Sequence, residues 1–262
     1  MPDVPLDVAG FDMTLNVITS FHKAGFEVYG RKFLESFKRH WTGVNLTIYF
    51  EDEHERNPNF NWVSIHDVEF LDEYMEKLRF PLFHGVQGDK YNINYDARMA
   101  RKSFIQMHAM NTFKGKVFWI DSDVITHEPV TPDFLHSVLP DDKFCCYLGR
   151  DGWMYTESGF LGFNADHRIA EQFRAAYLYT FMSGAIFIQP GWHDCYGFDT
   201  VRKALQSPDA FENLAKDCPH GTDHVFINSV LGSVMDHRKG ARKLNRSDPS
   251  ELVFGRDEKY WQ

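Results

Sequence analysis

The chain has 262 residues, of which 43% are hydrophobic and 16% aromatic, with 28 lysines and arginines against 37 aspartates and glutamates. This length and apolar fraction suffice for a closed core, which excludes disordered, collagen-like and coiled-coil chains. The net charge of −9, without a lysine- and arginine-rich run, lacks the basic surface of proteins that bind nucleic acid or anionic membranes, so we expect neither as a partner.

The first half of the chain alternates strand and helix patterns. Apolar and β-branched runs predict strands at residues 14–21, 45–50 and 62–68, and a charged helix is predicted at 69–78. Such alternation predicts a mostly parallel sheet with helices on both faces. The helix that follows the first strand has an apolar stripe formed by Phe26, Tyr29, Phe33, Phe37 and Trp41.

The second half continues in the same manner, without a repeat or a linker, so we expect one domain over residues 1–262. Residues 81–94 contain prolines and glycines and predict a loop. The remaining expected elements are a helix at 96–113, a strand at 116–120 (KVFWI), a helix at 132–139, a strand at 144–148, a glycine-punctuated stretch at 151–164, a helix at 167–179 and helical patterns near 199–206 and 223–235.

The four cysteines predict free thiols. Cys145 and Cys146 are adjacent, a spacing unsuited to an ordinary disulfide, and Cys195 and Cys218 form no CxxC pattern. Reduced cysteines favour the cytoplasm. The N-terminal residues lack the basic region of a signal peptide, and no apolar run approaches the ~20 residues that span a bilayer, so we expect neither a signal peptide nor a membrane anchor.

Two carboxylates follow the predicted strand at 116–120, in the triplet Asp121-Ser122-Asp123. Ligands of parallel α/β sheets bind at the carboxyl ends of the strands, and paired carboxylates there can hold one divalent cation. An acidic pair that caps a turn is the ordinary alternative.

A basic segment near the C-terminus contains a second motif. His237 stands three residues before Gly240 and six before Lys243, within the run DHRKGARK. The imidazole is a potential metal ligand, the glycine permits close backbone approach, and the lysine can meet a phosphate. Taken alone, the segment would suit a solvated basic tail equally well.

Together the two motifs resemble the paired signature of GT-A glycosyltransferases, in particular the glycogenin and lipopolysaccharide galactosyltransferase family (glycosyltransferase family 8). The resemblance implies an α/β GT-A fold, with a single Rossmann-like, mostly parallel sheet flanked by helices. It also implies that Asp121, Asp123 and His237 bind Mn²⁺, or alternatively Mg²⁺, on the diphosphate of a nucleotide sugar, which Gly240 and Lys243 contact. An imidazole ligand favours Mn²⁺.

Three shorter segments extend the resemblance. Tyr95-Asp96-Ala97-Arg98-Met99 is similar to the family's helix whose arginine lies beside the donor, and Lys102 shares a helix face with Arg98. Glu157-Ser158-Gly159 and Asp223-His224-Val225 resemble the family's sugar-site segments. There Glu157 replaces Asn, His224 replaces Gln and Val225 replaces Asp, so the identity of the sugar does not carry over.

The remaining site residues are inferred from their positions. Ser20, Phe21 and Asp52 (or Glu51) end the first two strands and are expected to contact the base and ribose, with core packing an equal alternative for Phe21. Three unassigned carboxylates are the candidate catalytic groups near the anomeric carbon: Asp223, Asp194 and Glu157.

The leading hypothesis is a metal-dependent hexosyltransferase (EC 2.4 class) that uses a UDP-hexose, with retention of configuration implied by the resemblance. The acceptor would be a glycan, a lipid-linked sugar, a protein hydroxyl or a small molecule.

A sugar nucleotidyltransferase is the alternative enzyme, but it should carry a glycine-rich basic loop after the first strand, where this chain has FHKAG at 21–25. A catalytically silent nucleotide-sugar or glycan-binding protein is the third hypothesis.

Overall fold

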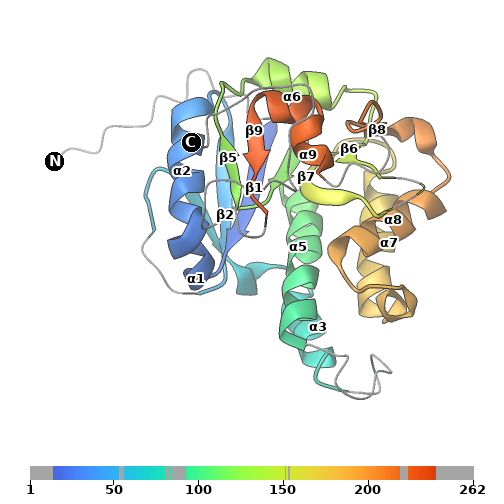
Figure 1. The fold of residues 1–262 in the computed structure, drawn as a ribbon. Helices are drawn as coiled ribbons and strands as arrows, with labels where there is room; N and C mark the ends of the chain where they lie inside the picture. The colour runs from blue at the N-terminus through green and yellow to red at the C-terminus, as the bar shows by residue number, and fades with distance from the viewer. Residues whose placement is uncertain are drawn as a thin grey trace.

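A seven-stranded sheet runs through the molecule (Figure 1) in a computed structural model that describes residues 14–52, 56–80, 83, 93–150, 152, 154–218 and 224–239. Its strand order is β3-β2-β1-β4-β7-β6-β8, and β5 pairs separately with β9. Only β7 runs antiparallel to its neighbours in this sheet, which is therefore mostly parallel as expected. The strands are β1 (Leu15–Phe21), β2 (Asn45–Phe50), β3 (Asn61–Ser64), β4 (Lys116–Ile120), β5 (Val124–Thr126), β6 (Cys145–Leu148), β7 (Glu157–Asn164), β8 (Phe211–Asn213) and β9 (Met235–His237).

Helices cover both faces of the sheet (Figure 1). One buried core contains residues of α3, α5, α7 and α8, and the other contains residues of α2, α6 and α9. The α-helices are α1 (Lys23–Gly25), α2 (Arg31–His40), α3 (Leu71–Lys77), α5 (Ile93–Thr112), α6 (Pro132–Val138), α7 (Ala170–Met182), α8 (Asp194–Ala204) and α9 (Val225–Asn228). A π-helix η1 (Phe26–Gly30) joins α1 to α2, and short 3₁₀ segments are η2 (Ile65–Asp67), η3 (Ala185–Ile188), η4 (Pro208–Ala210) and η5 (Val230–Ser233).

The central strand β4 supplies side chains to both cores, since successive residues of a strand point to opposite faces. Val117 and Trp119 lie in the core beneath α5, whereas Phe118 and Ile120 lie in the core beneath α2 and α6. This two-sided burial explains the continuous apolar run KVFWI. The adjacent Cys145 and Cys146 likewise lie in different cores, as free thiols.

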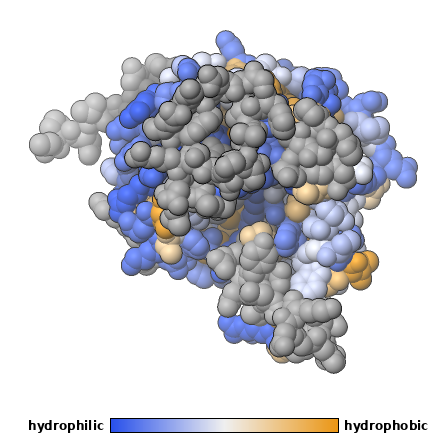
Figure 2. Space-filling view, in the orientation of Figure 1, coloured by the Kyte–Doolittle hydropathy of each residue, from blue (hydrophilic) through white to orange (hydrophobic). Residues whose placement is uncertain are grey.

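Polar side chains dominate the described part of the face shown in Figure 2, where apolar colour is confined to small patches. The larger exposed apolar side chains include Phe80, Tyr179 and Ile188. No helix in the described ranges combines the length and apolarity needed to cross a bilayer.

The predicted strands at 45–50 and 116–120 are confirmed residue for residue, and β1 and β6 each begin one residue later than expected. The predicted strand at 62–68 is shorter, because β3 ends where η2 begins. The stretch at 151–164, for which the sequence predicts no strand, contains β7, the strand between β4 and β6. Gly159 and Gly162 of β7 obscure the pattern, because they lack the apolar side chains that mark a buried strand.

Two helix predictions also need correction. The apolar stripe predicted at 26–41 includes Tyr29, but the π-helix η1 interrupts the helical period there. Tyr29 is therefore only half-buried, whereas Phe26 and Phe33 lie in the core. The helical pattern at 223–235 yields only the short α9 and η5 before β9. The expected helix near 199–206 is α8, which begins earlier.

Gly162→Ala should destabilise the protein. A Cβ at this position in β7 would lie 2.7 Å from the Cys146 Sγ and 2.8 Å from a Phe118 ring carbon, with backbone fixed on both sides. Overpacking of this kind costs about 1–3 kcal/mol, which urea unfolding would measure. Gln172→Ala on the exposed side of α7 is the control and should stay within about 0.5 kcal/mol. Equal stability of the two variants would contradict the tight packing of β7.

Candidate functional site

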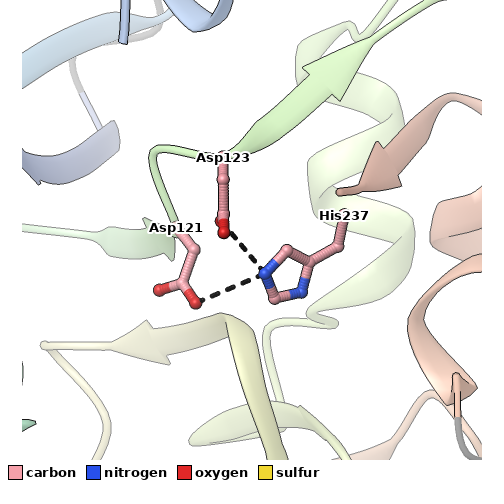
Figure 3. A group of neighbouring side chains, drawn as sticks. All are labelled: Asp121, Asp123 and His237. Carbon is pink, nitrogen blue, oxygen red and sulfur yellow. Dashed lines mark ion pairs between the residues drawn. The ribbon is translucent and has the colours of Figure 1, made fainter. Parts of the chain in front are cut away.

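Two segments far apart in the sequence meet beyond the carboxyl end of β4. A turn joins β4 to β5, in which the Val124 amide donates to the Asp121 carbonyl at 3.0 Å. β5 pairs antiparallel with β9, with Val124 opposite His237, and the Arg238 amide donates to the Asp123 carbonyl at 3.1 Å. The backbone thereby brings His237 beside the two aspartates (Figure 3).

Asp121, Asp123 and His237 form a compact group of potential metal ligands. The His237 Nε2 lies 3.0 Å from the Asp123 Oδ1 and 3.7 Å from the Asp121 Oδ2. One ligand atom from each residue lies within 4.8 Å of the others, and no further group of three such residues occurs in the part of the chain that the structure describes. Two carboxylates and an imidazole suit a divalent cation. The structure thus brings together the three residues that the sequence predicts as metal ligands, and metal binding itself stays a prediction.

The electrostatics of the group favour a positive charge at its centre. Burial opposes protonation of His237, but Asp123 and Glu157 outweigh it and raise the pKa of the imidazole to about 10. Burial likewise opposes ionisation of Glu157, yet His237 and Lys239 hold the pKa of its carboxyl well below the usual range. Carboxylates therefore surround an imidazolium at neutral pH.

Lys102 of α5 connects Asp121 with the start of α8. Its Nζ lies 2.7 Å from the Asp121 Oδ1 and 3.3 Å from the Asp194 Oδ2 at the start of α8, and it donates to the Ser158 hydroxyl at 3.2 Å. The Trp119 Nε1 donates to the same Asp121 oxygen at 2.6 Å. Burial opposes the charge on Lys102, but Asp121 and Asp194 outweigh it and raise its pKa.

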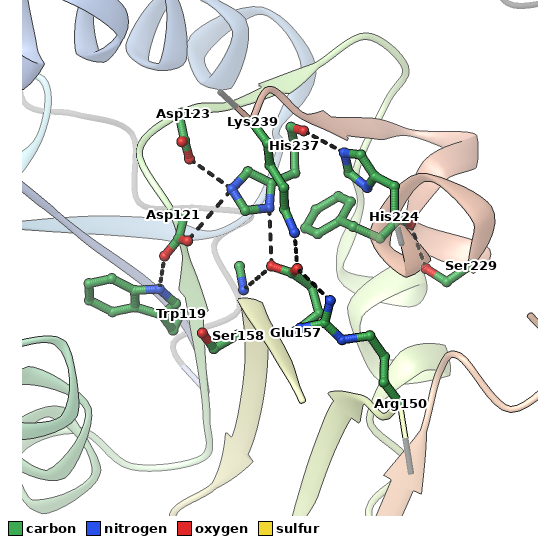
Figure 4. Close-up of polar contacts among 12 residues, drawn as sticks. Trp119, Asp121, Asp123, Arg150, Glu157, Ser158, His224, Ser229, His237 and Lys239 are labelled. Atoms are coloured by element: carbon green, nitrogen blue, oxygen red, sulfur yellow. Dashed lines mark hydrogen bonds and ion pairs between the residues drawn. The ribbon is translucent and has the colours of Figure 1, made fainter. Parts of the chain in front are cut away.

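Glu157, at the start of β7, lies on the opposite side of His237 from Asp123 (Figure 4). Its Oε1 is 3.3 Å from the His237 Nδ1 and accepts from the Gly159 amide at 3.1 Å. Its Oε2 pairs with Lys239 and is 3.9 Å from an Arg150 nitrogen.

His224, which replaces the family's Gln, supports the end of β9. Burial, with Lys239 and His237, lowers its pKa to about 4, so the ring is neutral at pH 7. Its Nε2 lies 2.8 Å from the His237 carbonyl oxygen, to which the neutral ring donates. This contact fixes the backbone of the metal-ligand candidate, a function that the sequence did not indicate.

A cleft of about 260 Å³ opens beside the aspartates. It is lined by Ser20, His22, Tyr29, Glu51, Met99, Lys102, Trp119, Asp121, Ser122 and Asp123. Ser20, predicted to contact the base and ribose, and Lys102, predicted to lie with Arg98 beside the donor, therefore line the same cleft as Asp121 and Asp123.

Of the other residues predicted for the nucleotide, Glu51 lines the cleft, whereas Asp52 and Phe21 do not. Glu51, which pairs with Arg101, lines the cleft, whereas the exposed Asp52 accepts from the Lys23 amide at 3.0 Å. Phe21 is 1% exposed and packs in the core against Phe26 and Phe33, the alternative that the sequence had left open.

Four of the residues predicted for the site lie wholly or partly outside the described part of the structure. Asp223, Gly240 and Lys243 are not among the described residues, and α5 is described at Arg98 only for its backbone. Sequence reasoning in turn missed Tyr29, Trp119 and Lys239. Trp119 carried a signal, since it stands two residues before Asp121 on the same strand face.

Comparisons with known proteins bear on the fold. No family model matches the chain, and no curated protein matches it. Among solved structures, the apo bifunctional glycosyltransferase WbbM matches with a TM-score of 0.50 and 12% identity over 78% of this chain, which spans only 39% of that one. Mouse xyloside xylosyltransferase 1 gives a TM-score of 0.48 with 10% identity, covering 76% of this chain and 84% of that one. The glycosyltransferase GlyE of Streptococcus pneumoniae TIGR4 gives 0.45 with 12% identity, covering 78% and 45%.

The likeness to WbbM shows the fold alone. Together with the strand order, it confirms the α/β GT-A-type sheet that the resemblance implied. Membership of the glycogenin family stays a prediction.

Gly159→Ala should disrupt the group of potential metal ligands. A Cβ on Gly159 would lie 2.5 Å from the His237 Nδ1, so the ring must move away from the strand. We expect this variant to lose most of the thermal stabilisation that MnCl₂ gives the wild type. Gly162→Ala in the same strand is the matched control, because its clash involves Cys146 and Phe118 instead. The same response to Mn²⁺ in both variants would contradict the close packing of His237 on β7.

Proposed function

We propose that this protein is a metal-dependent glycosyltransferase of the EC 2.4 class that transfers a hexose from a UDP-hexose to an acceptor hydroxyl. The observation that carries the proposal is the group Asp121, Asp123 and His237 at the carboxyl end of the central strand of a GT-A-type sheet. In such sheets this edge is where ligands bind.

The donor set fits a divalent cation. An imidazolium with a strongly raised pKa stands between carboxylates, so the site already stabilises a positive charge. Asp121, Asp123 and His237 would hold the ion, and the imidazole favours Mn²⁺ over Mg²⁺. The ion would supply Lewis-acid stabilisation of the departing nucleoside diphosphate.

The chain's own groups would bind and orient the donor. Ser20 of β1, Tyr29 of η1 and Glu51 after β2 line the cleft, where a ribose and base would be accommodated. Asp52 and Phe21 contribute less on this view, since one is exposed and the other is buried in the core. Lys102 keeps Asp121 in place and offers a positive charge to the donor from the floor of the cleft.

The basic residues near the diphosphate complete the proposal. Arg98, Gly240 and Lys243 are assigned to the diphosphate by the resemblance alone. A cation at Lys243 would neutralise part of the charge that develops on the leaving group.

The reaction is proposed to retain the anomeric configuration by attack on the face that the diphosphate leaves. Asp223, Asp194 and Glu157 are the candidate catalytic carboxylates, and no single one need be an indispensable nucleophile. The described Asp194 is 4% exposed and paired with Lys102, a position suited to orienting groups at the floor of the site.

The partners and compartment remain those inferred from the sequence. The acceptor would be a glycan, a lipid-linked sugar, a protein hydroxyl or a small molecule. The two buried free thiols, Cys145 and Cys146, support a reducing compartment, the cytoplasm.

The rival nucleotidyltransferase is less well supported. After β1 the chain enters α1 directly, and the His22 side chain caps it by accepting from the Gly25 amide at 2.7 Å. A glycine-rich phosphate loop would need this segment to be open. A silent binding protein would share the cleft, and donor hydrolysis separates it from the enzyme.

Asp123→Asn should abolish donor turnover. A screen of nucleotide sugars with MnCl₂ should find one that stabilises the wild type, by about 2.7 kcal/mol at a hundredfold excess over Kd, and that is hydrolysed or transferred. Loss of the Asp123 charge removes a cation ligand, whereas Asp194→Asn and Asp223→Asn should each keep measurable turnover. NMR of the product should show the donor's anomeric configuration preserved. Stabilisation without turnover would indicate the silent binding protein, and an inverted product would refute retention.

Lys243→Ala should weaken UDP binding. A charged hydrogen bond to phosphate contributes about 1.5–3 kcal/mol, so Kd should rise roughly 10- to 150-fold in calorimetric titration with Mn²⁺ present. Lys216→Ala is the matched control, since Lys216 is an exposed cation paired with Glu212 on β8. Unchanged UDP affinity in Lys243→Ala would show that this lysine does not contact the diphosphate.

A further inference from the structure

Glu157 faces the candidate metal ligand His237 from inside the protein. Each ring nitrogen of His237 lies near a different carboxylate: Nε2 is 3.0 Å from Asp123 and Nδ1 is 3.3 Å from Glu157 (Figure 4). The Glu157 side chain is only 7% exposed. The glycogenin family, which the sequence resembles, has Asn at this position. The buried carboxylate is therefore particular to this chain.

An imidazole that gives one nitrogen to a cation must keep its proton on the other. In metal sites this proton is normally donated to a carboxylate or a carbonyl, which fixes the tautomer and the ring orientation. The Glu157 Oε1 is the group that faces the Nδ1 of His237. We propose that Glu157 is a positioning residue, which accepts the Nδ1 proton of His237 and so presents Nε2 to the divalent cation. This inference rests on the metal centre of the proposed function.

The surroundings of Glu157 hold its carboxylate in place. The Gly159 amide donates to Oε1 at 3.1 Å, and Lys239 and Arg150 lie on the side of Oε2. Gly159 has no side chain, which lets the ring of His237 lie against β7 where a Cβ would otherwise intrude. Carboxylate, glycine and imidazole thus form one packed unit at the start of β7.

The same contacts argue against Glu157 as a nucleophile. A carboxylate that attacks an anomeric carbon needs an oxygen directed at the sugar, whereas both oxygens of Glu157 are directed at groups of the protein. Among the three candidate carboxylates, Glu157 therefore acts through His237 rather than on the substrate.

A purely structural ion pair between Glu157 and Lys239 is the competing explanation. It predicts that loss of either partner has the same effect, and that neither changes the ring of His237. The positioning role predicts a larger loss of metal affinity for Glu157 variants than for Lys239 variants, because Lys239 has no contact with the ring nitrogens among the described interactions.

Titration of the chain with Mn²⁺ alone, followed by EPR of the free ion, distinguishes the positioning role from the structural ion pair. Glu157→Gln keeps the size of the side chain but loses its charge, and we expect the Kd for Mn²⁺ to rise about 10- to 100-fold. Glu157→Asp, which keeps the charge, should recover part of the affinity and serves if the Gln variant fails to fold. The matched control is Glu212→Gln on β8, a carboxylate paired with Lys216 instead.

A second readout reports the tautomer directly. In the Zn²⁺-loaded wild type, ¹⁵N NMR should show His237 protonated at Nδ1 and metal-bound at Nε2, and Glu157→Gln should populate a second ring state. Unchanged Mn²⁺ affinity in Glu157→Gln, or an equal loss in Lys239→Met, would overturn the positioning role while leaving the metal centre intact. A wild-type protein that binds no Mn²⁺ would overturn both.

Discussion

The pairing of β9 with β5 is the constraint on which the rest of the site depends. It sets Val124 opposite His237 and thereby places an imidazole beside Asp121 and Asp123. Because side chains alternate along a strand, a slip of one residue would offer Asp236 or Arg238 in place of His237. The first would add a negative charge and the second a fixed cation, and neither completes the same ligand set. The chemistry of the site is therefore encoded in backbone register as much as in the residue types.

Charge compensation is the second organising feature. Acidic side chains gather where β4 and β7 meet α8, and each is opposed by a cation: His237 between Asp123 and Glu157, Lys102 between Asp121 and Asp194. If the proposed divalent ion binds at Asp121 and Asp123, it would displace the proton on the Nε2 of His237. On that proposal the carboxylates would face a positive charge both before and after the ion binds.

The sequence predicted the positions of the candidate metal ligands better than it predicted the strands and helices that hold them. The triplet after KVFWI and His237 in the basic segment could be recognised as candidate ligands, because the end of a strand and the residue types are local features of the sequence. β7 was not readable, since Gly159 and Gly162 are there to admit His237 and Phe118, neighbours supplied by other segments. The contact of Glu157 with His237 could not be predicted because it depends on tertiary pairing. The departure of Tyr29 from the apolar stripe could not be predicted because it depends on a π-helical turn.

The hydrogen bond from the Trp119 indole to Asp121 has an optical consequence. The chain has six tryptophans, and this one donates at 2.6 Å to the carboxylate that faces the cleft. Indole emission responds to the charge and hydrogen bonding of its surroundings, and any ligand that draws on Asp121 alters both. Trp119 is thus an intrinsic fluorophore hydrogen-bonded to the site, and its emission can report ligand binding there in real time without a label.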